Sequence, residues 1–135
     1  MSVIEYKYQK ATHEQLEKCV RWCLNNFQLR DWEVAISTDS IPPKRFIGDE
    51  GVTQNYGRTW VNTCTLKAEM WINMDFIKAD DANPYSTAIH EVKHILALER
   101  ADDAPEQYVC ITEPMLYRLY CYEHKLKIMD EKEFP

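Results

Sequence analysis

One stretch constrains this chain more than any other: YSTAIHEVKHILALE, residues 85–99. It holds His90, Glu91 and His94 in the spacing H-E-x-x-H. Most of the other positions are apolar and recur at helical intervals, namely Ile89, Val92, Ile95 and Leu96. The stretch is therefore predicted to be a helix that carries both histidines on one face. Asn83 before Pro84 suits an N-cap followed by proline in the first helical position, with Ser86 as an alternative cap.

The two histidines have the spacing of metal ligands. Imidazoles at positions i and i+4 of a helix lie one above the other and can bind a single ion. Glu91 is rotated by about 100° from His90, so it flanks the ion and can take a proton from a coordinated water. Catalytic zinc commonly has three protein ligands and lowers the pKa of its water to about 7. The alternative is a buried helix that carries two histidines by chance, but the cap and the apolar stripe favour a metal site.

The rest of the chain predicts an α+β domain. Thr12 and Gln15 have capping-box spacing and open a helix over residues 12–29. Alternating apolar residues then predict a short three-stranded, mainly antiparallel sheet, with strands at 31–37, 53–63 and 66–77.

The chain after the motif predicts one further helix and a loose end. The helix covers residues 105–127, with a kink or a break at Pro114. The charged tail, KIMDEKEFP, is expected to fray. The length of 135 residues suits one domain, 1–135.

Composition excludes several classes of protein. The formal net charge is -6 with scattered basic residues, so no nucleic-acid partner is expected. No apolar run approaches the ~20 residues that span a bilayer, and the N-terminus lacks a signal-peptide core, so we expect a cytoplasmic protein without a membrane partner. Five cysteines without C-x-x-C pairs predict free thiols, and Cys19 and Cys23 are better explained by core packing than by metal binding.

A third metal ligand has several candidates. Glu106 and Glu113 are seven apart and lie on nearly the same face of the last predicted helix. Asp102 and Asp103 are near, but helix capping explains them. The spacing favours neither of the other histidines, His13 and His124.

The motif and the glutamate-bearing helix after it resemble the gluzincin branch of zinc metallopeptidases. More narrowly, the chain is similar in length and layout to small phage- and prophage-type single-domain zincins, the minigluzincins. The resemblance implies a zincin-like fold, Zn²⁺ held by His90 and His94, and Glu91 as general base in peptide-bond hydrolysis. It favours Glu106 as third ligand, because EQYVC resembles the E-x-x-small-polar pattern of related families, and Glu113 is the alternative.

The resemblance also implies a peptide or protein substrate. The strand before the motif helix, residues 66–74, would lie at the edge of the sheet and pair with the substrate. Glu69, Trp71 and Asn73 would then line the cleft. A donor to the transition state is expected among Tyr117, Tyr120 and His124. The chain departs from metzincins, which have a third histidine in H-E-x-x-H-x-x-G-x-x-H.

These observations leave three alternative functions. The first is a zinc-dependent peptidase. The second is a zinc-stabilised protein-binding or regulatory domain, such as a phage accessory protein without significant peptidase activity. The third is a metal-free accessory or structural protein in which the motif is accidental.

Overall fold

The computed structural model describes residues 3–47, 55–99, 106–129 and 131–134, and the side chains within them except those of 3–5, 99, 106–112 and 131–134. Helices and a small sheet make an α+β fold, as predicted, in the order β1, α1, β2, β3, β4, α2, α3, α4, β5. A short 3-10 turn, η1 (Lys44–Phe46), lies between β2 and β3. None of the described helices is both long and apolar enough to cross a membrane.

The first helix, α1 (His13–Asn26), begins where its capping signals predict. The hydroxyl of Thr12 accepts from the backbone N–H of Gln15, and the Gln15 side chain accepts from the backbone N–H of Thr12. This reciprocal pair satisfies two backbone donors that the helix itself cannot.

The three-stranded sheet consists of β2 (Glu33–Ser37), β3 (Gly57–Asn62) and β4 (Lys67–Ile72), in the order β2-β4-β3. β4 is parallel to β2 and antiparallel to β3, so the sheet is mixed and not mainly antiparallel. β3 begins at the end of the sheet where β2 finishes, but the two strands are not neighbours. The hairpin after β3 places β4 between them. The prediction that residues 66–74 form the edge is therefore wrong, because β4 is the central strand.

Besides the short turn η1, three elements were not predicted, one helix and two strands. The strand expected through residue 77 ends at Ile72, and Asn73 caps a short helix, α2 (Met74–Ala79), by accepting from the backbone N–H of Phe76. The tail expected to fray includes a strand, β5 (Glu131–Phe134), that pairs antiparallel with β1 (Val3–Tyr6). That pairing joins segments that are far apart in the sequence, so no local pattern predicts it.

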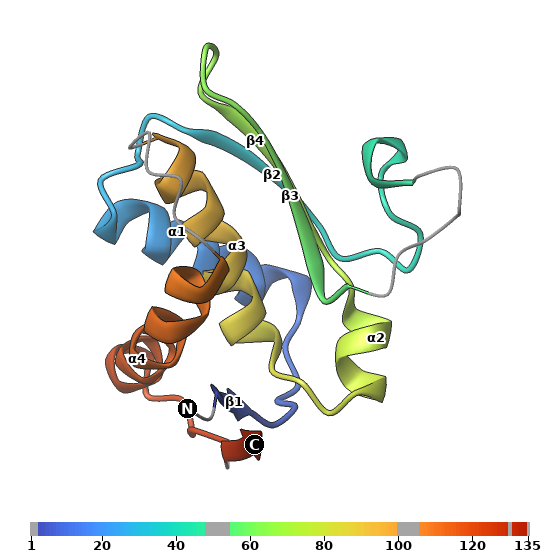
Figure 1. Ribbon diagram of the computed structural model, residues 1–135, viewed down its shortest axis with the longest axis vertical. Coiled ribbons are helices and arrows are strands. Elements are labelled where there is room, and N and C mark those ends of the chain that lie inside the picture. The colour runs from blue at the N-terminus through green and yellow to red at the C-terminus, as the bar shows by residue number, and fades with distance from the viewer. Residues whose placement is uncertain (1–2, 48–54, 100–105, 130, 135) are drawn as a thin grey trace.

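The motif helix, α3 (Pro84–Glu99), is the central element of the fold. Asn83 caps it, because its Oδ1 accepts from the backbone N–H of Ser86 at 3.1 Å. α3 contacts α1, β3 and β4 on one side and α4 (Glu106–His124) on another. α1 and α3 cover one face of the sheet (Figure 1).

Its central position explains the apolar composition of α3. Ala88, Ile89, Val92 and Ile95 are all fully buried. The inward-facing residues of β4, Ala68, Met70 and Ile72, belong to the same core. α4 runs through Pro114 as one helix, so the expected alternative of a break is wrong.

Candidate metal centre

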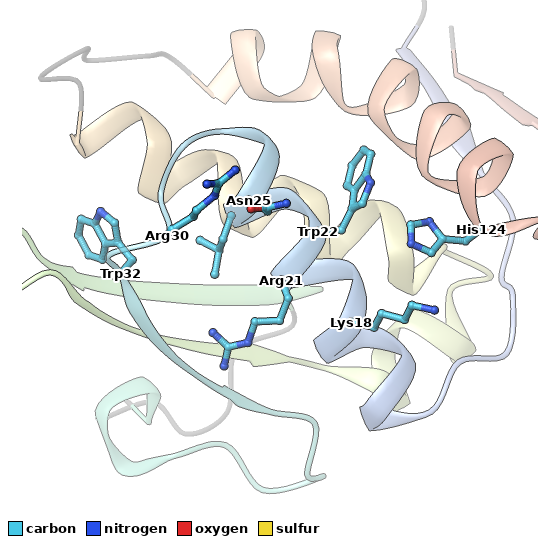
Figure 2. Close-up of a pocket in the computed structure, with 8 residues that line it drawn as sticks. Lys18, Arg21, Trp22, Asn25, Arg30, Trp32 and His124 are labelled. Carbon is cyan, nitrogen blue, oxygen red and sulfur yellow. The ribbon is translucent and has the colours of Figure 1, made fainter.

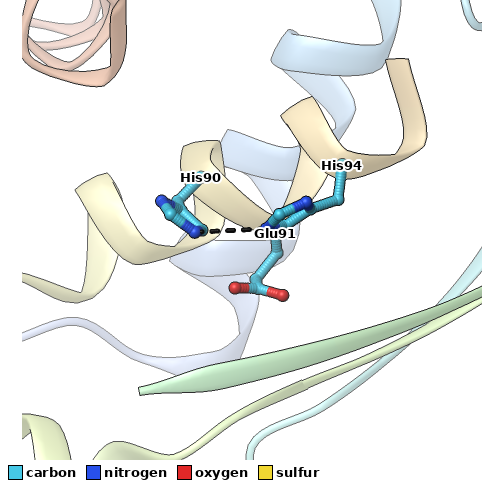
Figure 3. A group of neighbouring side chains, drawn as sticks. All are labelled: His90, Glu91 and His94. Carbon is cyan, nitrogen blue, oxygen red and sulfur yellow. Dashed lines mark hydrogen bonds between the residues drawn. The ribbon is translucent and has the colours of Figure 1, made fainter. Parts of the chain in front are cut away.

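His90 and His94 turn the same ring nitrogen toward each other. Their Nε2 atoms are 3.2 Å apart, and both rings are partly buried on α3 (Figure 3). Two nitrogen ligands at about 2.0–2.1 Å from a tetrahedral zinc ion are separated by about 3.3 Å. The pair therefore fits one ion between the two Nε2 atoms.

Glu91 supplies a carboxylate beside the two histidines. Its carboxylate and the two imidazoles offer ligand atoms that all lie within 4.8 Å of one another. Among the residues that the structure describes, this group of three is the one that could hold a metal ion in this way. Imidazole nitrogens are typical zinc ligands, and a carboxylate beside them can take a proton from a coordinated water, so the residues present fit the ion that the motif implies.

β3 positions the Glu91 side chain. Glu91 is 5% exposed, and its Oε1 accepts a 2.8 Å hydrogen bond from the hydroxyl of Thr59. A Cβ at Gly57 would lie 3.1 Å from Cγ of Glu91 and 3.1 Å from the carbonyl oxygen of Trp71. Glycine at position 57 therefore lets β3 approach the carboxylate closely. Gly57 and Thr59 were not predicted as site residues, because only the pairing of β3 with β4 and the packing of α3 on this sheet bring them to the motif.

Glu113 reaches the site from α4, but at the other side of the His90 ring. Its Oε2 lies 2.8 Å from Nδ1 of His90, whereas the Nε2 of His90 faces His94. Glu113 thus contacts the site without joining the converging group of three. The side chain of Glu106, the favoured third ligand, and Asp102 and Asp103 lie outside the described residues and side chains.

Lys93 is a buried cation within the motif. It is 4% exposed, and burial lowers the pKa of its ammonium group, while attraction to Glu113 and to Cys23 acts in the opposite direction. Lys93 occupies a position that the H-E-x-x-H pattern leaves unspecified, so its burial could not be predicted from the motif.

The remaining histidines have other partners. Nδ1 of His13 lies 3.0 Å from the hydroxyl of Thr38, and His124 stacks on Tyr120. Neither belongs to the converging group.

The two tyrosines considered as transition-state donors are core residues. Tyr117 is fully buried, and its hydroxyl donates to Gln9 at 2.6 Å and accepts from Asn83 at 3.1 Å. Tyr120 is 1% exposed and packs against Tyr85 and Trp22. In both cases burial raises the pKa of the phenol well above its usual range, so each is a neutral hydroxyl at neutral pH.

The residues expected to line a substrate cleft lie on the face of the sheet opposite α3 or at the start of α2. Glu69 and Trp71 point to the face opposite α3, where Glu69 pairs with Arg45 at 3.3 Å and the indole of Trp71 donates to the Asp39 carbonyl. Asn73 caps α2, and its amide donates to the carbonyl of Asn55. Glu69 and Trp71 lie on the opposite face because side chains alternate along a strand, and Ala68, Met70 and Ile72 lie on the face that packs on the helices.

A shallow hollow of about 470 Å³ lies along α1, away from the motif (Figure 2). Lys18, Arg21 and Arg30 contribute cations, Trp22 and Trp32 contribute aromatic surface, and His124 lies at one end. The hollow contains none of the three converging residues of α3.

Comparison with family models, with curated proteins and with solved structures finds no match for this chain.

Proposed function

We propose that this chain is a small zinc-dependent metallopeptidase in which His90 and His94 bind the ion and Glu91 is the general base. The observation that carries the proposal is the convergence of the two Nε2 atoms, 3.2 Å apart, beside the Glu91 carboxylate. Glu106 is kept as the proposed third ligand on the sequence argument alone. A zinc ion there would supply a Lewis acid that polarises a carbonyl and acidifies a water.

Glu91 has the surroundings that a general base needs. The hydroxyl of Thr59 holds one carboxylate oxygen, so the carboxylate has a fixed orientation beside the two imidazoles. Fixed orientation reduces the reorganisation that proton transfer would otherwise require.

β3 is the strand that we propose pairs with an extended peptide substrate. It is the edge strand of the sheet on the side of α3, and it carries Gly57 and Thr59, which contact Glu91. A peptide added to this edge would lie next to the carboxylate and would gain main-chain hydrogen bonds. We therefore propose β3 as the substrate-pairing strand in place of the central strand β4, which was expected from the sequence.

The second candidate is a zinc-stabilised protein-binding or regulatory domain without significant peptidase activity. The burial of Glu91 at 5% exposure and its hydrogen bond to Thr59 favour it, because both also suit a structural carboxylate.

The substitution Glu91→Gln distinguishes the two candidates. For a peptidase, we expect turnover of an unfolded protein substrate to fall by about 10²–10⁴-fold, because the amide cannot take a proton. Zinc content should be unchanged, as measured by elemental analysis after gel filtration. The exposed Glu33, at the start of β2, provides the control Glu33→Gln, which should keep full activity.

Two results would contradict the peptidase proposal. One is wild-type protein that holds zinc but cleaves no member of a peptide library read by mass spectrometry. The other is cleavage that Glu91→Gln leaves intact.

A further inference from the structure

The carboxylate of Glu113 contacts the ring nitrogen of His90 that does not face His94. Glu113 is on α4 and His90 is on α3, and the 2.8 Å contact between Oε2 and Nδ1 joins the two helices. Both side chains are largely buried, with 18% and 19% of their surface exposed. This contact lies in a shielded environment, where a hydrogen bond to a charged group is strong.

We infer that Glu113 is a positioning residue of the metal site and not its third ligand: it holds His90 in the tautomer whose Nε2 lone pair faces His94. The inference builds on the metal site of the proposed function.

The tautomer follows from the chemistry of the partner. A carboxylate only accepts hydrogen bonds, so Nδ1 of His90 must carry a proton and donate the hydrogen bond that Glu113 accepts. In a neutral imidazole the other nitrogen is then unprotonated, and its lone pair points along the ring toward His94. His90 is thereby prepared as a ligand before an ion arrives, and its ring orientation is fixed by α4.

The same contact argues against Glu113 as a ligand. Nδ1 and Nε2 lie on different edges of the imidazole, and the edge that faces His94 is the Nε2 edge. A carboxylate bound at Nδ1 is therefore outside the space between the two Nε2 atoms. This agrees with the converging group of His90, Glu91 and His94, which does not include Glu113.

The experiment compares Glu113→Gln and Glu113→Ala with wild type in two measurements. The control is Glu123→Gln, because Glu123 is on the same helix and has its own partner, the indole of Trp22 at 2.6 Å. The first measurement is the tautomer of His90 in metal-free protein, from ¹⁵N NMR of the imidazole at about pH 8, above the usual histidine pKa of about 6.5. The second is the zinc dissociation constant, from competition with a chelator.

We expect wild type and Glu123→Gln to hold His90 with the proton on Nδ1. Glu113→Ala should populate the form with the proton on Nε2, and its zinc dissociation constant should rise by about 10–100-fold. Glu113→Gln should be intermediate in both measurements, because the amide oxygen still accepts from Nδ1.

Two results would overturn the inference. One is a proton on Nε2 of His90 in metal-free wild type. The other is a tautomer that Glu113→Ala does not change, together with an unchanged zinc dissociation constant, which would make Glu113 a structural contact between the two helices. If wild type binds no zinc, the proposed function fails, whereas the tautomer still tests the role of Glu113.

Discussion

Two helices of this protein carry a pair of potential metal ligands at the same spacing. Cys19 and Cys23 are four residues apart on α1, and His90 and His94 are four apart on α3. Only the histidine pair belongs to a converging group of ligand atoms among the described residues. The comparison shows how little the spacing decides by itself.

The environments of the two pairs differ in polarity. Cys19 and Cys23 are fully buried in the core. Burial raises the pKa of the Cys19 thiol well above its ordinary value of 9.0, and a hydrogen bond with Cys23 raises it further. A thiol binds metal as the thiolate, so Cys19 is a poor ligand, and the two buried side chains act as small apolar core residues.

The histidine pair has carboxylates on both sides. Glu113 contacts His90 from α4, and Glu91 lies between α3 and β3. Both histidine side chains are partly exposed, unlike the two thiols. The neighbours from other elements, and not the i, i+4 spacing, make one pair a candidate metal site and leave the other in the core.

The largest expected difference between the pairs is in zinc content. We expect wild type to carry about one zinc per chain and His94→Ala to carry none after dialysis, because two ligands hold a catalytic ion weakly. The matched variant Cys23→Ala should keep its zinc and lose about 1 kcal/mol or more of stability from the cavity. Elemental analysis and urea unfolding measure the two effects. Loss of zinc in Cys23→Ala, together with retention of zinc in His94→Ala, would contradict the assignment of the ion to the histidine pair.

A smaller effect is expected from the residue that lets β3 approach Glu91. Gly57→Ala should lower turnover by about tenfold, because the new Cβ meets the Glu91 side chain at 3.1 Å and displaces the carboxylate. Zinc content should not change. Thr59→Ser keeps the hydroxyl that donates to Glu91 and should retain most of the activity. Equal turnover in Gly57→Ala and wild type would show that the position of Glu91 does not matter.

The smallest effect is a pH dependence that comes from the buried thiols. Because the pKa of Cys19 is higher in the folded chain, the folded state holds its proton above pH 9 while the unfolded state loses it. This stabilisation is complete below pH 9 and is lost as the pH rises toward the folded pKa. The free energy of unfolding should fall by up to about 1.4 kcal/mol per pH unit for one such thiol.

Urea unfolding at pH 8, 9 and 10 measures this slope. Cys19→Ala should flatten it, and Cys64→Ala, which removes an exposed thiol, provides the control. A slope that Cys19→Ala leaves unchanged would assign the alkaline instability to other groups.

Local signals were sufficient for several elements. The Thr12–Gln15 capping box, the Asn83-Pro84 start and the apolar stripe of residues 85–99 each act within one turn or one helix, so the sequence predicted α1 and α3 closely. The pairing of β1 with β5 and the central place of β4 depend on contacts between distant segments, and neither was predicted. The short helix α2 was missed because its Asn73 cap follows directly on a strand pattern.

By itself, the sequence determined that His90, Glu91 and His94 share a helix, since the spacing and the cap are local properties of the chain. The tertiary structure decided what surrounds them. It placed Thr59 and Gly57 against Glu91, and it placed Glu113 at Nδ1 of His90. The physical reason is that a hydrogen bond between side chains depends on distance in space, and the packing of β3 and α4 against α3 sets those distances.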